Sequence, residues 1–216
     1  MTLTVCATND WLRRFAQSVD DNAQLLTDLD AAIGDADHGS NMRRGMLAVV
    51  EQLENEPASQ IDGALRAAGM TLISTVGGAS GVLYGTFLLR MATALADRAT
   101  ATGPEVIAAL HAGLEGVRTR GHAELGDKTM VDVLAPVIDA LDAAVESGAS
   151  LADAASTAAI AAQAARDATT GLVARKGRAS YLGERSAGHV DPGAASTALL
   201  FAALAGALAE TAAVEA

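Results

Sequence analysis

Apolar residues recur every three or four positions along most of the chain, which is the spacing of one face of an α-helix. The first such stretch is carried by Trp11, Leu12, Phe15, Val19, Leu25, Leu26 and Leu29. Glycines, prolines and polar clusters separate it from the stretches that follow. We predict eight helices in all, over about residues 10–32, 42–53, 61–75, 80–96, 103–121, 127–145, 151–172 and 193–211.

The pattern predicts a single all-α domain over residues 1–216. Alternation of apolar and polar residues, which is typical of half-buried strands, is scarce. No change in composition and no Pro/Ser-rich linker marks a domain boundary. Half of the residues are hydrophobic but only 3% are aromatic, and alanine is abundant, so we expect closely packed helices with small side chains. The predicted fold is an antiparallel bundle of eight helices.

The net charge of −11 limits the kinds of partner that the chain can have. Nucleic-acid surfaces are basic, so DNA or RNA binding is not expected. A ligand with phosphates would need metal ions, or a local cluster of Arg and Lys, in so acidic a chain. The single cysteine, Cys6, excludes an internal disulfide and fits a reducing cytoplasm.

The two ends of the chain do not predict a membrane or export segment. Residues 1–10 have no positively charged start and no long apolar run, so no signal peptide is expected. The apolar run over 194–209 is shorter than the ~18 residues expected of a membrane span, and it is interpreted as a buried helix. We therefore expect a cytoplasmic protein without a membrane partner.

The unusual residues lie in the loops after the first, third, fifth and seventh predicted helices. These loops cover residues 34–39, 77–81, 121–129 and 175–193. In an up-and-down bundle, alternate connections lie at the same end. The four loops are therefore predicted to converge on one end of the bundle, called the rim below, and to form one composite site there.

Three aspartates, Asp30, Asp35 and Asp37, lie within eight residues at the first of these loops. Carboxylates so close together repel one another, and a hard divalent cation is the usual reason for such a cluster. Mg²⁺ takes carboxylate oxygens together with substrate phosphates. The alternative is a solvated acidic loop in which Asp37 caps the next helix.

Two further loops contain glycine patterns that suit anions. Gly77-Gly78-Ala79-Ser80-Gly81 precedes a helix and could bind phosphate through free N–H groups, or form a plain turn with Ser80 as the N-cap. The stretch 121–129 is not a P-loop, because Asp127 stands between Gly126 and Lys128 and no strand precedes it. Its simpler interpretation has Asp127 as an N-cap and Lys128 in solvent.

Two other familiar sites are excluded. An EF-hand that started at Asp35 would need Gly and Glu where Ser40 and Met46 stand. No histidine has a convincing Ser or Cys nucleophile as a partner.

The last loop, over 175–193, is long, polar and rich in glycine. Loops of this length in compact domains are usually functional or disordered. Arg178 is a candidate phosphate ligand because its guanidinium offers bidentate donors, whereas Lys176 and Arg185 are weaker candidates that solvent more often surrounds. Order in this loop is predicted from its apolar anchors, which are Tyr181, Leu182, Val190 and Pro192.

Taken together, these motifs resemble the nucleotide-binding L subunit of dihydroxyacetone kinases over essentially the whole chain. The resemblance rests on Asp30 with Gly34-Asp-Ala-Asp-His-Gly39, on Gly77-Gly-Ala-Ser-Gly81 with Tyr84-Gly85-Thr86, on Gly126-Asp-Lys-Thr-Met130, and on Gly177-Arg-Ala-Ser-Tyr-Leu-Gly-Glu-Arg-Ser186 with Gly188-His-Val-Asp-Pro-Gly193.

The resemblance implies an eight-helix barrel with ADP or ATP bound at one rim. It implies two Mg²⁺ ions held by Asp30, Asp35 and Asp37, and stabilisation of the moving charge by Arg178 as the catalytic residue. The residues that it places at the nucleotide are His38, Gly39, Ser40, Asn41, Ala79, Ser80, Gly121, Met130, Arg178, Asp191, Pro192 and Gly193.

Two positions depart from the family's pattern. Ala36 stands where members often have Gly, so we expect a turn that does not require a positive φ there. Val82 stands where Pro is frequent, and it loses only a preset φ in the first helical turn. Neither change removes a ligand.

The function implied is that of a phosphoryl-donor subunit, with the ketone bound on a separate K subunit. The donor is either exchanging ATP or a retained ADP that is rephosphorylated by a phosphohistidine protein of the phosphoenolpyruvate phosphotransferase system, which a free-standing chain favours. The acceptor is dihydroxyacetone or a related ketose such as erythrulose.

Two other functions stay open, as does a homodimer. One is a regulatory nucleotide-binding module that signals phosphorylation state to a transcriptional regulator. The other is a structural helical protein without a ligand, for which replacement of Asp30, Asp35 and Asp37 by alanine would be harmless.

Overall fold

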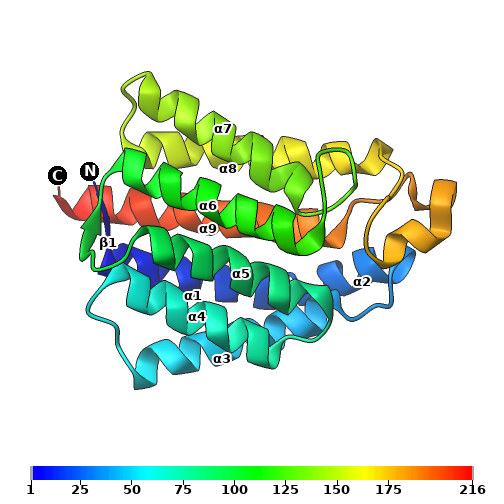
Figure 1. Cartoon of the computed structure of the whole chain (residues 1–216), viewed down its shortest axis with the longest axis horizontal. Coiled ribbons are helices and arrows are strands. Elements are labelled where there is room, and N and C mark those ends of the chain that lie inside the picture. The colour runs from blue at the N-terminus through cyan, green and yellow to red at the C-terminus, as the bar shows by residue number, and fades with distance from the viewer. Residues whose placement is uncertain (1, 216) are drawn as a thin grey trace.

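Helices α1 and α3–α9 form a closed ring in which each helix packs against the next and α9 returns to α1 (Figure 1). The computed structural model describes residues 2–215. The bounds of its helices are α1 Val5–Asp21, α2 Ala23–Ile33, α3 His38–Asn55, α4 Ile61–Thr75, α5 Gly78–Ala94, α6 Gly103–Gly121, α7 Val131–Glu146, α8 Leu151–Ala168 and α9 Pro192–Glu215, with the 3-10 segments η1 Thr169–Gly171 and η2 Arg178–Ser186. The predicted all-α barrel of eight helices is confirmed.

The prediction of one helix over residues 10–32 was wrong, because the chain breaks at Asn22 between α1 and α2. Asn22 has φ −108° and ψ 11°, and its side-chain amide donates to the carbonyl of Ser18 at 2.8 Å. Asparagine competes in this way with the helical backbone. The break gives α2 its own direction, so that this helix extends beyond the ring (Figure 1). Asp30 lies in the last turn of α2.

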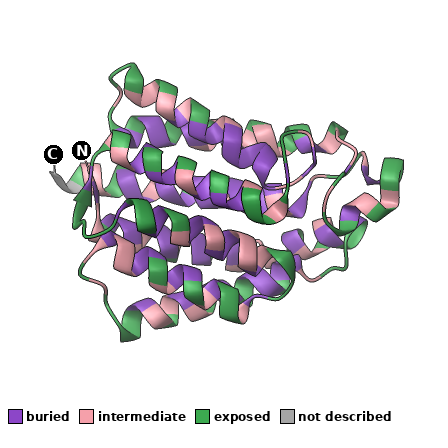
Figure 2. Cartoon of the chain, viewed as in Figure 1, coloured by how far each residue is buried: buried purple, intermediate pink, exposed green. Residues whose placement is uncertain are grey.

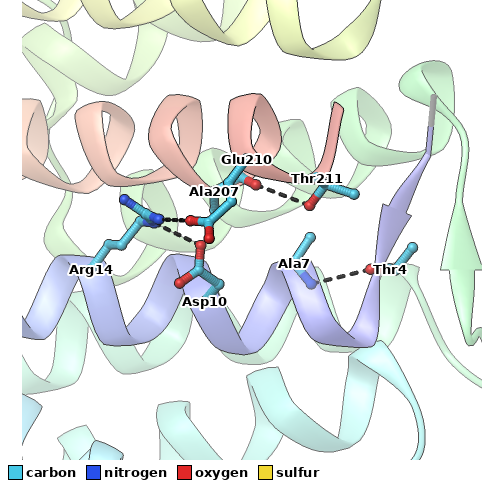
Figure 3. A network of polar contacts seen from close by, with 7 residues as sticks. All are labelled: Thr4, Ala7, Asp10, Arg14, Ala207, Glu210 and Thr211. Atoms are coloured by element: carbon cyan, nitrogen blue, oxygen red, sulfur yellow. Dashed lines mark hydrogen bonds and ion pairs between the residues drawn. The ribbon is translucent and has the colours of Figure 1, made fainter. Parts of the chain in front are cut away.

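Two polar links join α1 to α9 and close the ring. The indole of Trp11 is fully buried and donates to the carbonyl of Leu200 at 2.8 Å. Within one turn of Trp11, Arg14 forms ion pairs with Asp10 and with Glu210 (Figure 3). These surface pairs contribute little to stability, whereas the buried indole satisfies its only donor.

The buried residues lie on the inner faces of the helices (Figure 2). The core that they form is mainly built from small and aliphatic side chains. Helices α4 and α5 approach each other closely through Gly69 and Gly85. A Cβ added to Gly85 would lie 2.7 Å from the carbonyl oxygen of Gly69, so no larger residue fits there. Close packing of this kind explains how a chain with few aromatic residues fills its interior.

The end of the barrel opposite the rim carries the only extended pairing in residues 2–215. Strands β1 (Leu3–Thr4) and β2 (Thr100–Ala101) pair antiparallel, with Leu3 opposite Ala101. Both termini lie at this end (Figure 1). The pairing fixes the start of α1 and the entry to α6, and it leaves the rim unobstructed.

Helix α9 is long and apolar enough to cross a membrane, since Pro192–Ala213 has a mean hydropathy of 1.6. The expectation that this run is too short for a span was therefore wrong. The interpretation as a buried helix agrees with the packing, because 61% of the most apolar window is buried and the helix lies between α1 and α8. Core helices commonly have this composition.

Candidate functional site

The four loops predicted to form one site meet at the rim, at the end of the barrel away from the termini (Figure 1). They enclose two adjoining cavities. The first, of about 190 Å³, is lined by the aspartates of the α2–α3 turn and by residues of the other three loops. The second, of about 460 Å³, is mainly apolar and is lined by Val82, Leu83, Val117, Ala123, Met130 and Val131, among others. Ala79 and Met130 line both cavities.

The carboxylate groups of Asp30, Asp35 and Asp37 lie close together. One carboxylate oxygen from each lies within 4.8 Å of the other two. Asp30 is buried at the end of α2, and its Oδ2 accepts from the backbone N–H of Asp37 at 2.8 Å and of His38 at 3.1 Å. These bonds fix the turn, and they leave the carboxylates of Asp35 and Asp37 accessible at its surface.

Gly34 is required by the close approach of Asp30 to the chain. A Cβ at position 34 would lie 2.0 Å from Oδ1 of Asp30, a distance that no side chain tolerates. The glycine therefore allows the carboxylate to fold back over the turn.

The expectation that the turn does not need a positive φ at Ala36 was wrong. Ala36 has φ 62°, in the left-handed region that glycine adopts freely and other residues adopt at a cost. The chain therefore carries local backbone strain between Asp35 and Asp37.

His38 is buried, and both of its ring nitrogens have partners within the protein. Nδ1 lies 3.0 Å from Oγ of Ser80 and Nε2 lies 2.9 Å from Oγ of Ser196. Ser196 also bonds to the hydroxyl of Tyr84 at 2.7 Å. Burial lowers the pKa of His38, which favours the neutral ring. The network ties the Asp turn to α5 and α9, and sequence reasoning missed Tyr84 and Ser196 as its members.

The glycine loop before α5 places the start of a helix at the first cavity, but Ser80 is not its N-cap. The helix begins at Gly78 with Gly77 as the N-cap, and no side chain caps it. Ser80 lies in the first turn and lines the first cavity. The first N–H groups of a helix lack intrahelical acceptors, and here the residues that carry them line the first cavity.

Lys128 is buried, so the expectation that it is solvated was wrong. Its side chain is 1% exposed, and Nζ donates to the carbonyls of Thr169 at 2.6 Å, Leu172 at 3.0 Å and His189 at 2.5 Å. All three donors of the ammonium are thus used. Loss of bulk water lowers the pKa of Lys128, while the charges of Asp191 and Asp132 oppose that shift. Through these hydrogen bonds, Lys128 joins the two ends of the loop that carries Arg178.

Asp127 does not cap α7, because that helix begins at Val131. The carboxylate of Asp127 accepts instead from the N–H of Glu124 at 2.9 Å. Asp132 organises the loop that precedes the helix, since it accepts from the N–H groups of Gly126 at 2.5 Å and Thr129 at 2.7 Å. The sequence alone offered no signal for a carboxylate that caps from inside the helix.

The long loop over 175–193 is ordered by contacts with α2. Ile33, Ala174 and Ala179 form a small buried cluster, and Leu182 packs against it. Tyr181 was also predicted to anchor the loop, which was wrong, since it is 87% exposed. The buried cluster holds η2 beside the Asp turn.

Arg178 reaches the metal-binding candidates directly. Its Nε lies 2.9 Å from Oδ2 of Asp35, and 68% of its side chain is exposed. The guanidinium therefore lies at the mouth of the first cavity, next to the carboxylate that a cation would use.

Asp191 ends the loop beneath the first cavity. Its Oδ2 accepts from the N–H of Ala194 at 2.7 Å, at the start of α9. Burial raises the pKa of Asp191 to about 7, and the nearby charge of Asp132 adds to the shift. Lys128 acts in the opposite direction.

The structure brings most of the predicted site residues together. Those that line the first cavity are Asp30, Asp35, Asp37, His38, Ala79, Ser80, Met130, Arg178, Asp191, Pro192 and Gly193. Gly121 lines the second. Gly39, Ser40 and Asn41 line neither cavity.

Gly39 and Asn41 are buried against other parts of the chain, and Ser40 lies at the surface. A Cβ on Gly39 would lie 2.0 Å from the carbonyl of Ala23, and the amide oxygen of Asn41 accepts from Arg44 at 2.7 Å. Ser40 is exposed, and its hydroxyl donates to the carbonyl of Asp37 at 3.0 Å.

The donor set fits a hard divalent cation next to phosphates. Three carboxylates with convergent oxygens are the ligands that Mg²⁺ prefers. The adjoining apolar cavity has the size and lining of a site for a flat organic group. His38 and Ser80 both line the first cavity, with Nδ1 of the histidine 3.0 Å from Oγ of the serine. The expectation that no histidine has a serine partner was therefore wrong.

Comparisons with known proteins agree with this arrangement. The DAK2 domain family matches residues 32–206. The PEP-dependent dihydroxyacetone kinase 1, ADP-binding subunit DhaL, of Listeria innocua is 48% identical over 201 residues, which cover 90% of this chain and 92% of that protein. The PEP-dependent dihydroxyacetone kinase, ADP-binding subunit DhaL, of Escherichia coli is 45% identical over 205 residues, which cover 95% and 98%.

A solved structure has the same fold. The dihydroxyacetone kinase of C. freundii, in complex with AMP-PNP and Mg²⁺, is 27% identical with a TM-score of 0.71. The match covers 92% of this chain but 33% of that one, so this chain corresponds to about a third of that kinase. From the family match and the identity over nearly whole chains, we conclude that this chain belongs to the DAK2 domain family, among the DhaL subunits of dihydroxyacetone kinases, which are phosphotransferases.

Proposed function

We propose that this chain is the phosphoryl-donor subunit of a dihydroxyacetone kinase. It would hold magnesium with ADP or ATP at the rim and transfer the γ-phosphoryl group to a ketone bound on a separate K subunit. The observation that carries the proposal is the junction of an apolar cavity with three convergent carboxylates. Such a junction suits a ligand that has a base at one end and metal-bound phosphates at the other.

Asp30, Asp35 and Asp37 are the proposed ligands of two Mg²⁺ ions. When bound, the ions supply neutralisation of the phosphate charge, which phosphoryl transfer needs more than it needs covalent help from the protein. The backbone N–H groups of Asp37 and His38 orient Asp30 for this role. Asp35 and Asp37 then complete the set from the turn.

The nucleotide is proposed to lie across both cavities. The base would contact Gly121 and Met130 in the larger cavity, and the phosphates would meet Ser80 and the start of α5. Gly193 and Pro192 would close the other side, at the start of α9. The names of the relatives support ADP as the nucleotide.

Arg178 is the proposed catalytic residue. Its exposed guanidinium at the mouth of the cavity can leave Asp35 and turn toward the phosphoryl group in transfer. A planar guanidinium binds phosphate oxygens in a bidentate way and stabilises charge that develops on them.

The ketone and the phosphoryl supply are proposed to come from partner proteins in the cytoplasm. The relatives are named as PEP-dependent, which supports an ADP that stays bound and is recharged by a phosphohistidine protein. The acceptor would be dihydroxyacetone or a related ketose.

The released nucleotide tests this proposal. The freshly purified protein is denatured without added nucleotide, and the supernatant is analysed. Near-stoichiometric ADP would support a retained coenzyme, and an empty protein that binds added Mg–ATP would support exchange. Transfer to dihydroxyacetone in the presence of a K subunit then separates a kinase subunit from a regulatory nucleotide-binding module.

A further inference from the structure

Four aspartates and three cations line the first cavity, and two of the three positive charges are already in use. Lys128 donates all three of its N–H bonds to backbone carbonyls. Arg178 is paired with Asp35. Lys176 is the third cation of this lining, and within residues 2–215 its side chain has no hydrogen bond or ion pair. Its ammonium therefore has three free donors.

Lys176 lies where the two cavities join. It lines both of them, as do Ala79 and Met130 on other elements. Arg120, the other cation of the second cavity, does not line the first. A positive charge at the junction faces the part of a ligand that connects an apolar end to a metal-bound end.

The backbone just before Lys176 is held by two hydrogen bonds. The N–H of Arg175 donates to the carbonyl of Asp127 at 3.0 Å, and the N–H of Ala174 donates to Oγ of Ser186 at 2.8 Å. Gly177 follows with φ 65°, which starts η2 at Arg178. The lysine is thus presented from an anchored backbone, so only its side chain must be ordered when a ligand binds.

We infer that Lys176 binds the phosphate nearest the ribose, the α-phosphate, of the nucleotide. This inference rests on the proposed function. With the base in the apolar cavity and the outer phosphates at the aspartates, the α-phosphate falls between them, at the junction. Four aspartates line the first cavity, so an unneutralised phosphate would be repelled there. A compact ammonium is suited to a single phosphate that the metal does not cover.

The test compares ADP, AMP and adenosine, because AMP keeps the α-phosphate and adenosine lacks it. Binding to the wild type, Lys176→Gln and Lys176→Arg is measured by calorimetry in Mg²⁺, with AMP and adenosine measured by displacement of ADP. Lys176→Gln is expected to weaken the binding of ADP and of AMP by about tenfold each. The affinity for adenosine should stay within twofold of that of the wild type. Lys176→Arg is expected to restore most of the loss. Arg185→Gln, in the same loop but outside both cavities, is the matched control and should bind as the wild type does.

A ³¹P spectrum of bound ADP gives a readout that does not depend on affinity. Lys176→Gln should shift the α-phosphorus resonance and leave the β resonance in place. The inference would be overturned if Lys176→Gln lost affinity for ADP but not for AMP, if it lost as much affinity for adenosine, or if no affinity changed. The same loss in Arg120→Gln in place of Lys176→Gln would also overturn it. A wild type that binds no Mg–ADP would contradict the proposed function itself, which is a different result.

Discussion

Arg178 is held by Asp35, with Nε of the guanidinium 2.9 Å from Oδ2 of the carboxylate. The proposed catalytic cation is therefore paired with a proposed metal ligand. Because 68% of the arginine side chain is exposed, water screens the pair and its contribution to stability is small. A cation bound at Asp35 would compete for the same oxygen and would release the guanidinium toward the phosphates.

Replacement of Arg178 by glutamine is expected to separate catalysis from folding. Loss of one group that stabilises transition-state charge typically lowers kcat by about 10²–10³-fold. The free energy of unfolding should change by less than about 1 kcal/mol, since the ion pair is exposed. Phosphoryl transfer in the reconstituted kinase and urea unfolding are the two measurements, with Arg185→Gln as the control. A variant with unchanged kcat would exclude a catalytic role.

Replacement of Lys128 by methionine should be costly although no ligand contact is lost. Methionine fills similar space but leaves the carbonyls of Thr169, Leu172 and His189 without their donor. We expect a loss of about 3 kcal/mol in unfolding free energy, with faster amide exchange over 172–189. Arg66→Met, on an exposed face of α4, should change stability by less than about 0.5 kcal/mol. Equal stabilities for the two variants would show that the buried ammonium is not a structural clip.

Stability should depend on pH through Asp191. Its pKa is about 7 in the folded protein and 3.8 in an ordinary setting, so the folded state holds the proton more tightly. Below pH 4 the group is protonated in both states. Between about pH 4 and 7 only the unfolded chain ionises, so stability falls as pH rises, at up to about 1.4 kcal/mol per pH unit. Above pH 7 the contribution levels off.

Asp191→Asn removes this titration and isolates it. Unfolding free energies of the variant and the wild type are measured by urea from pH 4 to 8. The variant should gain stability relative to the wild type as pH rises to about 7, and the gain should then stay constant. A difference that does not vary with pH would mean that Asp191 ionises normally in the folded protein.

Ala36→Gly should stabilise the protein. Ala36 adopts φ 62°, where an alanine costs about 1 kcal/mol relative to glycine. The greater freedom of glycine in the unfolded chain offsets part of this, so we expect a gain of about 0.5 kcal/mol in calorimetry. Ala31→Gly, inside α2, should destabilise by a similar amount or more. A destabilised Ala36→Gly variant would show that the turn is not strained.

Much of the fold could be predicted because helical periodicity is local. The spacing of Trp11, Phe15 and Val19 identifies the buried face of α1. Glycine pairs such as Gly77-Gly78 identify the places where one helix ends and the next begins. The break at Asn22 was missed because apolar spacing continues through it, while the side chain that breaks the helix bonds to a carbonyl four residues away.

Site residues could be predicted where the functional groups are close together in the sequence. They could not be predicted where a residue's role depends on its burial in the folded protein. Asp30, Asp35 and Asp37 are close in the chain, so their cluster could be read directly. Lys128 could not, because its acceptors, from Thr169 to His189, come from 41 to 61 residues away. Whether Lys128 is buried or solvated depends on tertiary packing, which no local sequence pattern encodes.

Magnesium-dependent binding of ADP is the property that a phosphoryl-donor site at the rim must have. Calorimetry would compare the wild type with Asp35→Asn and with Asp28→Asn, an exposed aspartate on α2. We expect tight ADP binding with Mg²⁺, at least tenfold weaker binding with a chelator, the same loss in Asp35→Asn, and wild-type behaviour in Asp28→Asn. Binding that ignores both Mg²⁺ and Asp35, or no binding of ADP or ATP at all, would contradict the proposed function.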